Sequence, residues 1–149
     1  MVTKGDKAPD FTLKDCDGGT FTLSKAIEEA KAFVVIYFYP NANTFGCLKE
    51  SCSFRDNHDK FLSQGATVIG ISKNDATKNK KMKDDNNLPF LLLCDETLEV
   101  HKLYGIGSLS NSRQTFCINK EGVVTFVYNN VMLFFNHTSK VLNAIADTK

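Results

Sequence analysis

The sequence predicts an α/β fold in which a mixed central sheet is covered by helices on both faces. Continuous apolar runs, typical of buried strands, alternate with stretches of helical pattern through the first half of the chain. The last two strands flank a short turn and so add an antiparallel hairpin. The chain has 149 residues, of which 42% are hydrophobic and 23% charged. This size and composition predict one globular domain spanning residues 1–149.

The chain is expected to open with a small β-hairpin and a helix. Phe11–Leu13 and Phe21–Leu23 alternate apolar and polar residues, and Asp17–Gly19 supplies the turn between them. Ser24 is a candidate N-cap for a short helix that ends near Ala32.

Strands and helices then alternate, and each apolar run is followed by a more polar stretch of helical pattern. The predicted elements are a strand at Phe33–Phe38, a helix at Leu48–Leu62, a strand at Ala66–Ile71, a helix at Asp75–Asn86, a strand at Phe90–Leu93 and a short helix at Glu96–Tyr104.

The chain closes with a hairpin and a helix. Gln114–Ile118 and Val123–Tyr128 flank the turn Asn119–Gly122, and a helix is predicted from about His137 to Ala146. A hairpin after a βαβ unit is the thioredoxin-like pattern, so we predict a thioredoxin-like fold with an added N-terminal hairpin. Reactive groups of open α/β sheets gather beyond the carboxyl ends of the strands, where the loop at 39–47 lies.

Composition and charge exclude several classes of function. The formal net charge is +1, and the most basic stretch, Lys73–Lys83, contains an acid and no aromatic residue, so we expect no nucleic-acid partner. No apolar stretch approaches the roughly 18 residues of a membrane span, and Met1–Asp6 lacks the apolar core of a signal peptide. Five cysteines without the spacing of a disulfide scaffold favour an intracellular compartment, with the cytoplasm as default and organelle targeting as the alternative.

Cys47 and Cys52 are the candidate reactive residues. Cys47 falls in the first turn of a helix that follows the strand Phe33–Phe38, where amide groups and the helix dipole stabilise a thiolate. On an intact helix the Cα atoms of the two cysteines would be about 8.7 Å apart and about 140° around the axis. A disulfide needs a separation below roughly 7 Å, so the pair can bridge only if the helix unwinds.

The segment at 39–56 closely resembles the active-site segment of the peroxiredoxins, in particular the bacterioferritin comigratory protein / peroxiredoxin Q subfamily. The shared pattern is Pro-x-x-x-Thr-x-x-Cys, with a second cysteine five residues on and Phe-Arg-Asp behind it. The resemblance covers nearly the whole chain. Further matching segments, in family order, are Gly5–Phe11, Val68–Ser72, Pro89-Phe90, Tyr104-Gly105 and Arg113–Phe116.

The resemblance implies a role for each cysteine. Cys47 would be the peroxidatic cysteine, which attacks the O–O bond of a peroxide as a thiolate and becomes a sulfenic acid. Cys52 would be the resolving cysteine, which condenses with that sulfenic acid to an intramolecular disulfide. Taken alone, a cysteine at a helix start is more often structural, and Cys52 could be a buried helix residue.

Four further site residues follow from the same resemblance. Thr44 would hydrogen-bond the thiolate and orient the peroxide, and Pro40 would shield the thiolate from water. Arg113 would bring positive charge beside Cys47, and Glu50 would help to place it. Because a peroxide is small and uncharged, rate must come from a low thiol pKa and from donors preorganised for the transition state. The alternatives are an N-cap for Thr44, a stiff loop for Pro40, a surface site for Arg113 and a first-turn acid suited to the helix dipole for Glu50.

The implied activity is thiol-dependent reduction of hydrogen peroxide and organic hydroperoxides, without metal, haem or flavin. Thioredoxin or a similar dithiol protein would return the disulfide to the dithiol, and we expect a monomer with a weak dimer as the alternative. A second hypothesis is a peroxide sensor or redox relay that passes oxidation to a partner protein. A third is a thioredoxin-like binding module without catalysis.

Other chemistries fit the residues less well. A metal site at Cys47, Cys52 and His58 would have a spacing that is not a recognised zinc arrangement. A cysteine hydrolase would need a histidine near Cys47, and no hydrolase signature surrounds that residue. Thioredoxin chemistry needs Cys-x-x-Cys, which the chain lacks.

The remaining cysteines and histidines are interpreted as structural. We expect Cys94 and Cys117 to be buried core thiols and Cys16 to lie in or beside the hairpin turn, where exposure would allow a redox or intermolecular role. His58 is expected on an exposed helix face, and His137 is interpreted as the start of the last helix.

Two segments depart from the subfamily. Where its members commonly have Thr-Pro-Gly-Cys-Thr, this chain has Phe45 and Leu48 in place of the proline and the second threonine. Loss of the proline removes a preset φ and restores a backbone donor at the helix start. Met132–Phe135 is apolar where relatives are usually more polar, and it would be either core under the last helix or an exposed patch that serves as a partner or dimer surface.

We predict that Phe45→Pro changes the rate of disulfide formation or the preference among hydroperoxides, because it alters helix entry and reduces bulk beside the pocket. Stopped-flow rates with hydrogen peroxide and a bulkier hydroperoxide measure both. Unchanged kinetics on both counts would contradict the hypothesis.

Overall fold

The computed structural model describes residues 2–42, 44–107, 112–129 and 136–147, apart from the side chains of residues 45 and 47. Within this part, seven strands form one mixed sheet in the order β2-β1-β5-β4-β3-β6-β7. The strands are β1 (Thr12–Asp15), β2 (Thr20–Thr22), β3 (Phe33–Phe38), β4 (Ala66–Ser72), β5 (Leu91–Cys94), β6 (Gln114–Asn119) and β7 (Val124–Asn129). Strands β3, β4 and β5 are parallel and the other pairs are antiparallel.

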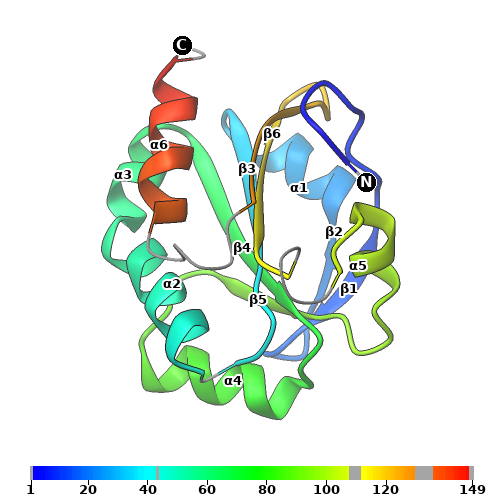
Figure 1. Cartoon of the computed structure of the whole chain (residues 1–149), viewed down its shortest axis with the longest axis vertical. Helices are drawn as coiled ribbons and strands as arrows, with labels where there is room; N and C mark the ends of the chain where they lie inside the picture. The colour runs from blue at the N-terminus through cyan, green and yellow to red at the C-terminus, as the bar shows by residue number, and fades with distance from the viewer. Residues whose placement is uncertain (1, 43, 108–111, 130–135, 148–149) are drawn as a thin grey trace.

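Helices cover both faces of the sheet, as predicted (Figure 1). Side chains of α2 (Phe45–Asp56), α3 (His58–Ser63), α4 (Ala76–Asp85) and α6 (His137–Asp147) pack on one face, and those of α1 (Leu23–Glu29) and α5 (Glu99–Tyr104) pack on the other. The two cores are separated by β3, whose six residues are all buried. Its alternate side chains enter opposite cores because successive residues of a strand point to opposite faces.

Several predicted boundaries were wrong. Thr22, rather than Ser24, is the N-cap of α1, because Ser24 already lies inside that helix. The predicted helix 48–62 is two helices, separated at Asn57, whose φ of −107° and ψ of 12° are not helical. Helix α5 begins at Glu99 because Leu98, at φ 62°, is left-handed. Asp75 caps α4 as predicted by accepting a bond from the Lys78 amide. Met132–Phe135 lie outside the described residues.

The register between β3 and β6 determines where Arg113 lies. Phe38, the last residue of β3, pairs with Gln114, the first residue of β6. Because the two strands are antiparallel, the start of β6 lies at the carboxyl end of β3, where the chain enters α2. Arg113, one residue before β6, is therefore brought to the helix that carries both candidate cysteines.

A stack of aromatic rings fixes α2 on the sheet. Tyr37 of β3 lies 4.5 Å from the Phe54 ring at an interplanar angle of 17°, and Phe54 continues to Phe61 of α3 at 5.5 Å. The Tyr37 and Ser51 hydroxyls are hydrogen-bonded at 2.8 Å. Gly70 of β4 leaves room for this ring, because a Cβ there would lie 2.8 Å from Tyr37 Cζ.

We predict that Gly70→Ala lowers the free energy of unfolding by about 1–3 kcal/mol, because the added methyl must displace the Tyr37 ring. Denaturant unfolding measures the change. Thr67→Ala, an exposed site on the same strand, is the control and should stay within about 0.5 kcal/mol of the parent. Equal stability of Gly70→Ala and the parent would show that the ring can move freely.

Candidate active site

Helix α2 begins just before Cys47, as the sequence predicts. Thr44 is the N-cap, with an extended backbone, and Cys47 lies in the first turn of the helix. The amide groups of that turn carry the positive end of the helix dipole, which stabilises a thiolate. The side chains of Cys47 and Phe45 lie outside the described part, so the site is defined by this backbone and by the residues around it.

The helix between the two cysteines is wound. Helix α2 runs without a break from Phe45 to Asp56, so the Cα atoms of Cys47 and Cys52 are about 8.7 Å apart. Cys52 is a free, partly exposed cysteine. A disulfide between the two cysteines does not fit this wound helix, because it cannot span this separation.

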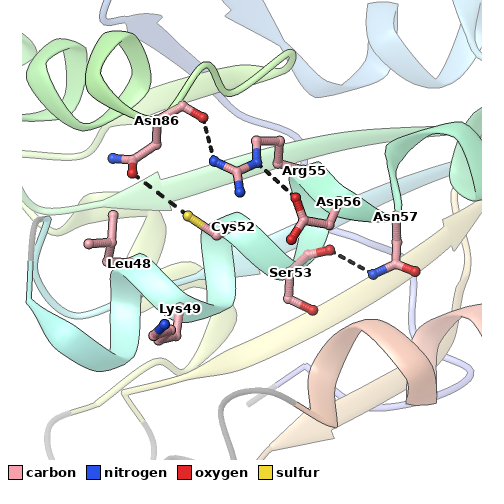
Figure 2. Close-up of a pocket in the computed structure, with 8 residues that line it drawn as sticks. All are labelled: Leu48, Lys49, Cys52, Ser53, Arg55, Asp56, Asn57 and Asn86. Carbon is pink, nitrogen blue, oxygen red and sulfur yellow. Dashed lines mark hydrogen bonds and ion pairs between the residues drawn. The ribbon is translucent and has the colours of Figure 1, made fainter.

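Cys52 opens into a pocket of about 460 Å³ between α2 and the end of α4 (Figure 2). Its Sγ lies 3.8 Å from Asn86 Oδ1. Arg55 donates a 2.8 Å bond to the Asn86 carbonyl and a 3.0 Å bond to Asp56, so its guanidinium lies on the same side as the thiol (Figure 2). Leu48 and Lys49 line the other end of this Cys52 pocket.

Thr44 and Pro40 lie in the loop that leads into α2. Thr44 is exposed, and its hydroxyl donates a 2.8 Å bond to the Asn41 carbonyl instead of capping the helix by its side chain. The N-cap alternative therefore holds for the backbone of Thr44 only. Its hydroxyl oxygen keeps lone pairs to accept a bond from a peroxide O–H. Pro40 is half-buried between the buried Tyr39 and the exposed Asn41.

Two buried amide side chains, one just after β4 and one in α4, hold that loop. Asn74 accepts a 2.6 Å bond from the Ala42 amide and donates a 3.0 Å bond to Asn41 Oδ1. The Tyr39 hydroxyl donates a 2.7 Å bond to Asn79 Oδ1. These bonds tie the loop before α2 to β4 and α4, and they were not predicted, because nothing in the sequence pairs these amides with the loop.

Arg113 and Glu50 form a buried ion pair. Glu50 is 0% and Arg113 4% exposed, and Arg113 Nη1 donates a 3.0 Å bond to Glu50 Oε1. The surface-site alternative for Arg113 is therefore wrong. The first-turn alternative for Glu50 is wrong too, because α2 has no acid in its first turn. Cys47 precedes Glu50 by three residues, so the two share one face of the helix and Arg113 is held against that face.

Burial raises the pKa of Glu50 to about 8, and the charge and hydrogen bond of Arg113 only partly oppose this rise. Near neutral pH the carboxyl therefore holds a proton for much of the time. Where it does, the positive charge of Arg113 is not cancelled and remains available to a thiolate on the same helix face.

The other cysteines have no such environment. Cys94 and Cys117 are buried, as expected, but the expected exposure of Cys16 is wrong, because that residue is only 4% exposed. Burial raises the pKa of each thiol, to about 11 for Cys117. These thiols therefore stay neutral and unreactive at neutral pH.

The burial and contacts of the histidines differ in part from the prediction. His58 is half-buried, with its ring 6.1 Å from that of Phe90, so the exposed face predicted for it is wrong. His101 Nδ1 lies 2.6 Å from Asp95 Oδ2, in the core on the other face of the sheet. His137 starts α6 as predicted, yet it is 0% exposed and its Nδ1 lies 3.3 Å from Glu50 Oε2. Its place beside the site was missed, because no sequence spacing relates it to α2.

The described residues give no support for a metal site or a membrane-spanning helix. No group of three or more histidine, cysteine, aspartate or glutamate side chains is arranged there to hold a metal ion. None of the helices within that part of the chain has the length and apolar character needed to cross a membrane.

The sequence is similar to those of known peroxiredoxins. The model of the AhpC/TSA family matches residues 4–127. The chloroplastic peroxiredoxin Q of Oryza sativa subsp. japonica is 44% identical over 149 residues, which cover 97% of this chain and 67% of that protein. For the chloroplastic peroxiredoxin Q of Arabidopsis thaliana the identity is 43% over 145 residues, covering 95% of this chain and 66% of the relative. The chain thus spans about two thirds of the length of these relatives.

Solved structures share the fold. A crystal structure of peroxidoxin BcpB from Mycobacterium tuberculosis matches with a TM-score of 0.92 at 30% identity and covers 100% of this chain and 99% of the other. A structure of peroxiredoxin Q from Xanthomonas campestris gives 0.84 at 24% identity, with 99% and 96% covered. These matches confirm the predicted thioredoxin-like fold.

We predict that stability depends on pH through Glu50. Its pKa is higher in the folded chain than the ordinary value of 4.5, so its contribution is fully present below about pH 4.5 and is lost as pH rises through about 8. Relative to Glu50→Gln, the parent should lose free energy of unfolding over that window, on the order of a few kcal/mol. Denaturant unfolding from pH 5 to 9 measures the difference.

The control is Glu28→Gln, at an exposed position of α1, whose stability should follow that of the parent across the range. Parallel curves for the parent and Glu50→Gln would contradict the assignment of a raised pKa to Glu50.

Proposed function

The chain belongs to the AhpC/TSA family and is a thiol-dependent peroxidase, an oxidoreductase of the peroxiredoxin type, and from that premise we propose that Cys47 is the residue that peroxide oxidises. The observation that carries the proposal is the buried pair of Arg113 and Glu50 on the helix face that Cys47 shares. It supplies a fixed positive charge where a thiolate and a leaving oxyanion need one.

In the proposed first step, the Cys47 thiolate attacks one oxygen of the peroxide. The new S–O bond forms as the O–O bond breaks, sulfur is oxidised to a sulfenic acid, and the leaving hydroxide or alkoxide takes a proton to become water or alcohol. Arg113 stabilises the charge on both oxygens, and Thr44 orients the peroxide by accepting its O–H. Pro40, half-buried at the loop, limits the access of water.

In the proposed second step, the first half of α2 unwinds and the Cys52 thiolate attacks the sulfenic sulfur, forming the disulfide and releasing hydroxide, which takes a proton from solvent to become water. The anchoring of the helix supports this division. Phe54 is 0% exposed in the aromatic stack and holds the second half. Thr44 and Lys49 are exposed and Gly46 and Leu48 are only half-buried, so these residues at the start of the helix keep less of their surface in the core than Phe54, although Glu50 is buried.

A peroxide substrate and a thiol reductant are what the peroxiredoxin family implies. More specifically, we propose hydrogen peroxide and organic hydroperoxides as substrates, with no metal, haem or flavin in the reaction. Thioredoxin or a similar dithiol protein would attack the disulfide at Cys52, whose sulfur borders an open pocket. We further propose that residues 1–149 act as one domain and a monomer, with a weak dimer as the alternative. The chloroplastic relatives support an organelle as its location, and the cytoplasm stays the alternative.

The redox-relay alternative gains no support from the similarity to peroxiredoxin Q proteins. It keeps both cysteines but predicts poor turnover with thioredoxin. A binding module without catalysis predicts no peroxide consumption at all.

We predict that Cys47→Ser abolishes peroxide consumption driven by a thioredoxin system. Cys52→Ser should lose thioredoxin-supported cycling but still form one sulfenic acid, because only the resolving thiol is removed. Consumption of NADPH measures cycling, and a sulfenic-acid probe with mass spectrometry measures the adduct.

Cys117→Ser is the control and should cycle like the parent, because that thiol is buried and neutral. Full activity of Cys47→Ser would refute the proposal. Efficient peroxide reaction without thioredoxin turnover in the parent would favour the relay.

A further inference from the structure

We propose that His137 is a positioning residue for the peroxidase reaction: it holds the second oxygen of Glu50 and thereby fixes Arg113 beside the first turn of α2. This inference goes beyond the proposed function and rests on the roles assigned there to Cys47 and Arg113. His137 touches neither of the reacting atoms in this scheme and acts only through Glu50.

The geometry joins three elements through one carboxyl group. Glu50 of α2 meets Arg113 Nη1 with Oε1 at 3.0 Å and His137 Nδ1 with Oε2 at 3.3 Å. The Thr115 hydroxyl of β6 lies 2.7 Å from the same nitrogen. Two contacts on opposite oxygens leave the carboxyl little freedom to rotate, so the guanidinium that it binds is held as well.

The tautomer follows from these partners. When Glu50 is ionised, its carboxylate only accepts hydrogen bonds, and a hydroxyl can donate or accept, so a proton on His137 Nδ1 then suits both neighbours. We therefore assign the N–H of His137 to Nδ1, which is hydrogen-bonded to the Thr115 hydroxyl and lies 3.3 Å from Glu50 Oε2, a buried oxygen without a hydrogen-bond partner among the described residues. An amide N–H at the same place would serve the same purpose.

The ring is held from the remaining sides. Tyr128 of β7 packs edge-on at 4.6 Å between ring centroids and 83° between planes. Next to it, the hydroxyls of Ser53 and Thr138 bond at 2.8 Å and join α2 to the start of α6. The titratable groups that the described residues place against His137 are thus Glu50 on α2 and Tyr128 on β7, and Arg113 lies on the far oxygen of Glu50.

Burying the polar side chains of Glu50, Arg113 and His137 costs free energy that an apolar cluster would not. Glu50 and His137 are both 0% and Arg113 is 4% exposed, and burying an ion pair often costs more free energy than its attraction returns. Buried titratable groups cluster at functional sites, and this cluster lies one helical turn from the proposed nucleophile. Its cost in free energy is therefore explained by a function. The geometry assigns that function to the orientation of Arg113.

The test compares His137→Leu, His137→Asn and His137→Gln, all in a Cys52→Ser background so that Cys47 is the only reactive thiol. The measurement is the pH dependence of Cys47 alkylation by iodoacetamide, with the rate constant for hydrogen peroxide at pH 7. His137→Leu should move the alkylation profile up by about one pH unit and slow the peroxide reaction about tenfold, because Arg113 loses its fixed place.

His137→Asn should keep the profile of the parent, because its amide nitrogen takes the place of Nδ1. His137→Gln carries the same amide one carbon further and should shift the profile as His137→Leu does. This pair decides the question even if His137→Leu fails to fold, since a shared profile for the Asn and Gln variants would overturn the proposal.

The matched control is His101→Leu, a buried histidine whose Nδ1 also lies close to a carboxyl oxygen, that of Asp95, but on the other face of the sheet. It should leave the alkylation profile unchanged. An equal shift in His101→Leu and His137→Leu would reduce the effect to general loosening and overturn the inference. An inactive parent, or full activity in Cys47→Ser, would instead refute the proposed function.

Discussion

Glu50 and Arg113 face each other inside the protein, and their contact constrains everything around the first half of α2. The helix can take only the rotation that directs Glu50 inward, and that rotation fixes the face on which Cys47 lies. The register of β3 with β6 fixes the other partner, because pairing of Phe38 with Gln114 leaves Arg113 at the end of the strand that leads into the helix. A one-residue slip of β6 would turn Arg113 to the opposite core.

Apolar packing holds the second half of α2, whereas hydrogen bonds hold the first half. The second half is fixed by the stack of Phe54 on Tyr37, a contact that contributes about 0.5–1.5 kcal/mol beyond its buried area. The first half depends on directed bonds, from Glu50 to Arg113 and from the loop before the helix to Asn74. Hydrogen bonds can be exchanged for bonds to water, whereas the aromatic stack has no such replacement. The boundary between these contacts therefore marks where the helix can unwind.

The sequence was sufficient for the order of the elements, because alternation and apolar runs predict strands from local patterns. A cysteine in the first turn after a buried strand predicts a reactive helix start, whereas the roles of the other site residues in α2 come from the resemblance to the peroxiredoxins and stay predictions. The wrong or missing predictions concern contacts between residues of different helices and strands. Cys16 looked exposed because it lies beside a turn, yet it packs in the core that β5 and Met82 share. His137 gave no signal, because its contact with Glu50 spans 87 positions and depends on how α6 packs on α2.

In the proposed mechanism, the buried pair of Glu50 and Arg113 that favours the Cys47 thiolate also opposes the disulfide. Glu50 and Ser51 lie between Cys47 and Cys52, so the unwinding that brings the two sulfurs together must also pull Glu50 away from Arg113 and Ser51 away from Tyr37. Before oxidation these contacts stabilise the wound helix, where positive charge beside sulfur is needed. After oxidation the thiolate is gone and that charge has no partner to stabilise. The bond to Cys52 then replaces the ion pair as the contact that holds this segment, so each state of the helix has its own stabilising interaction and the two cannot be formed together.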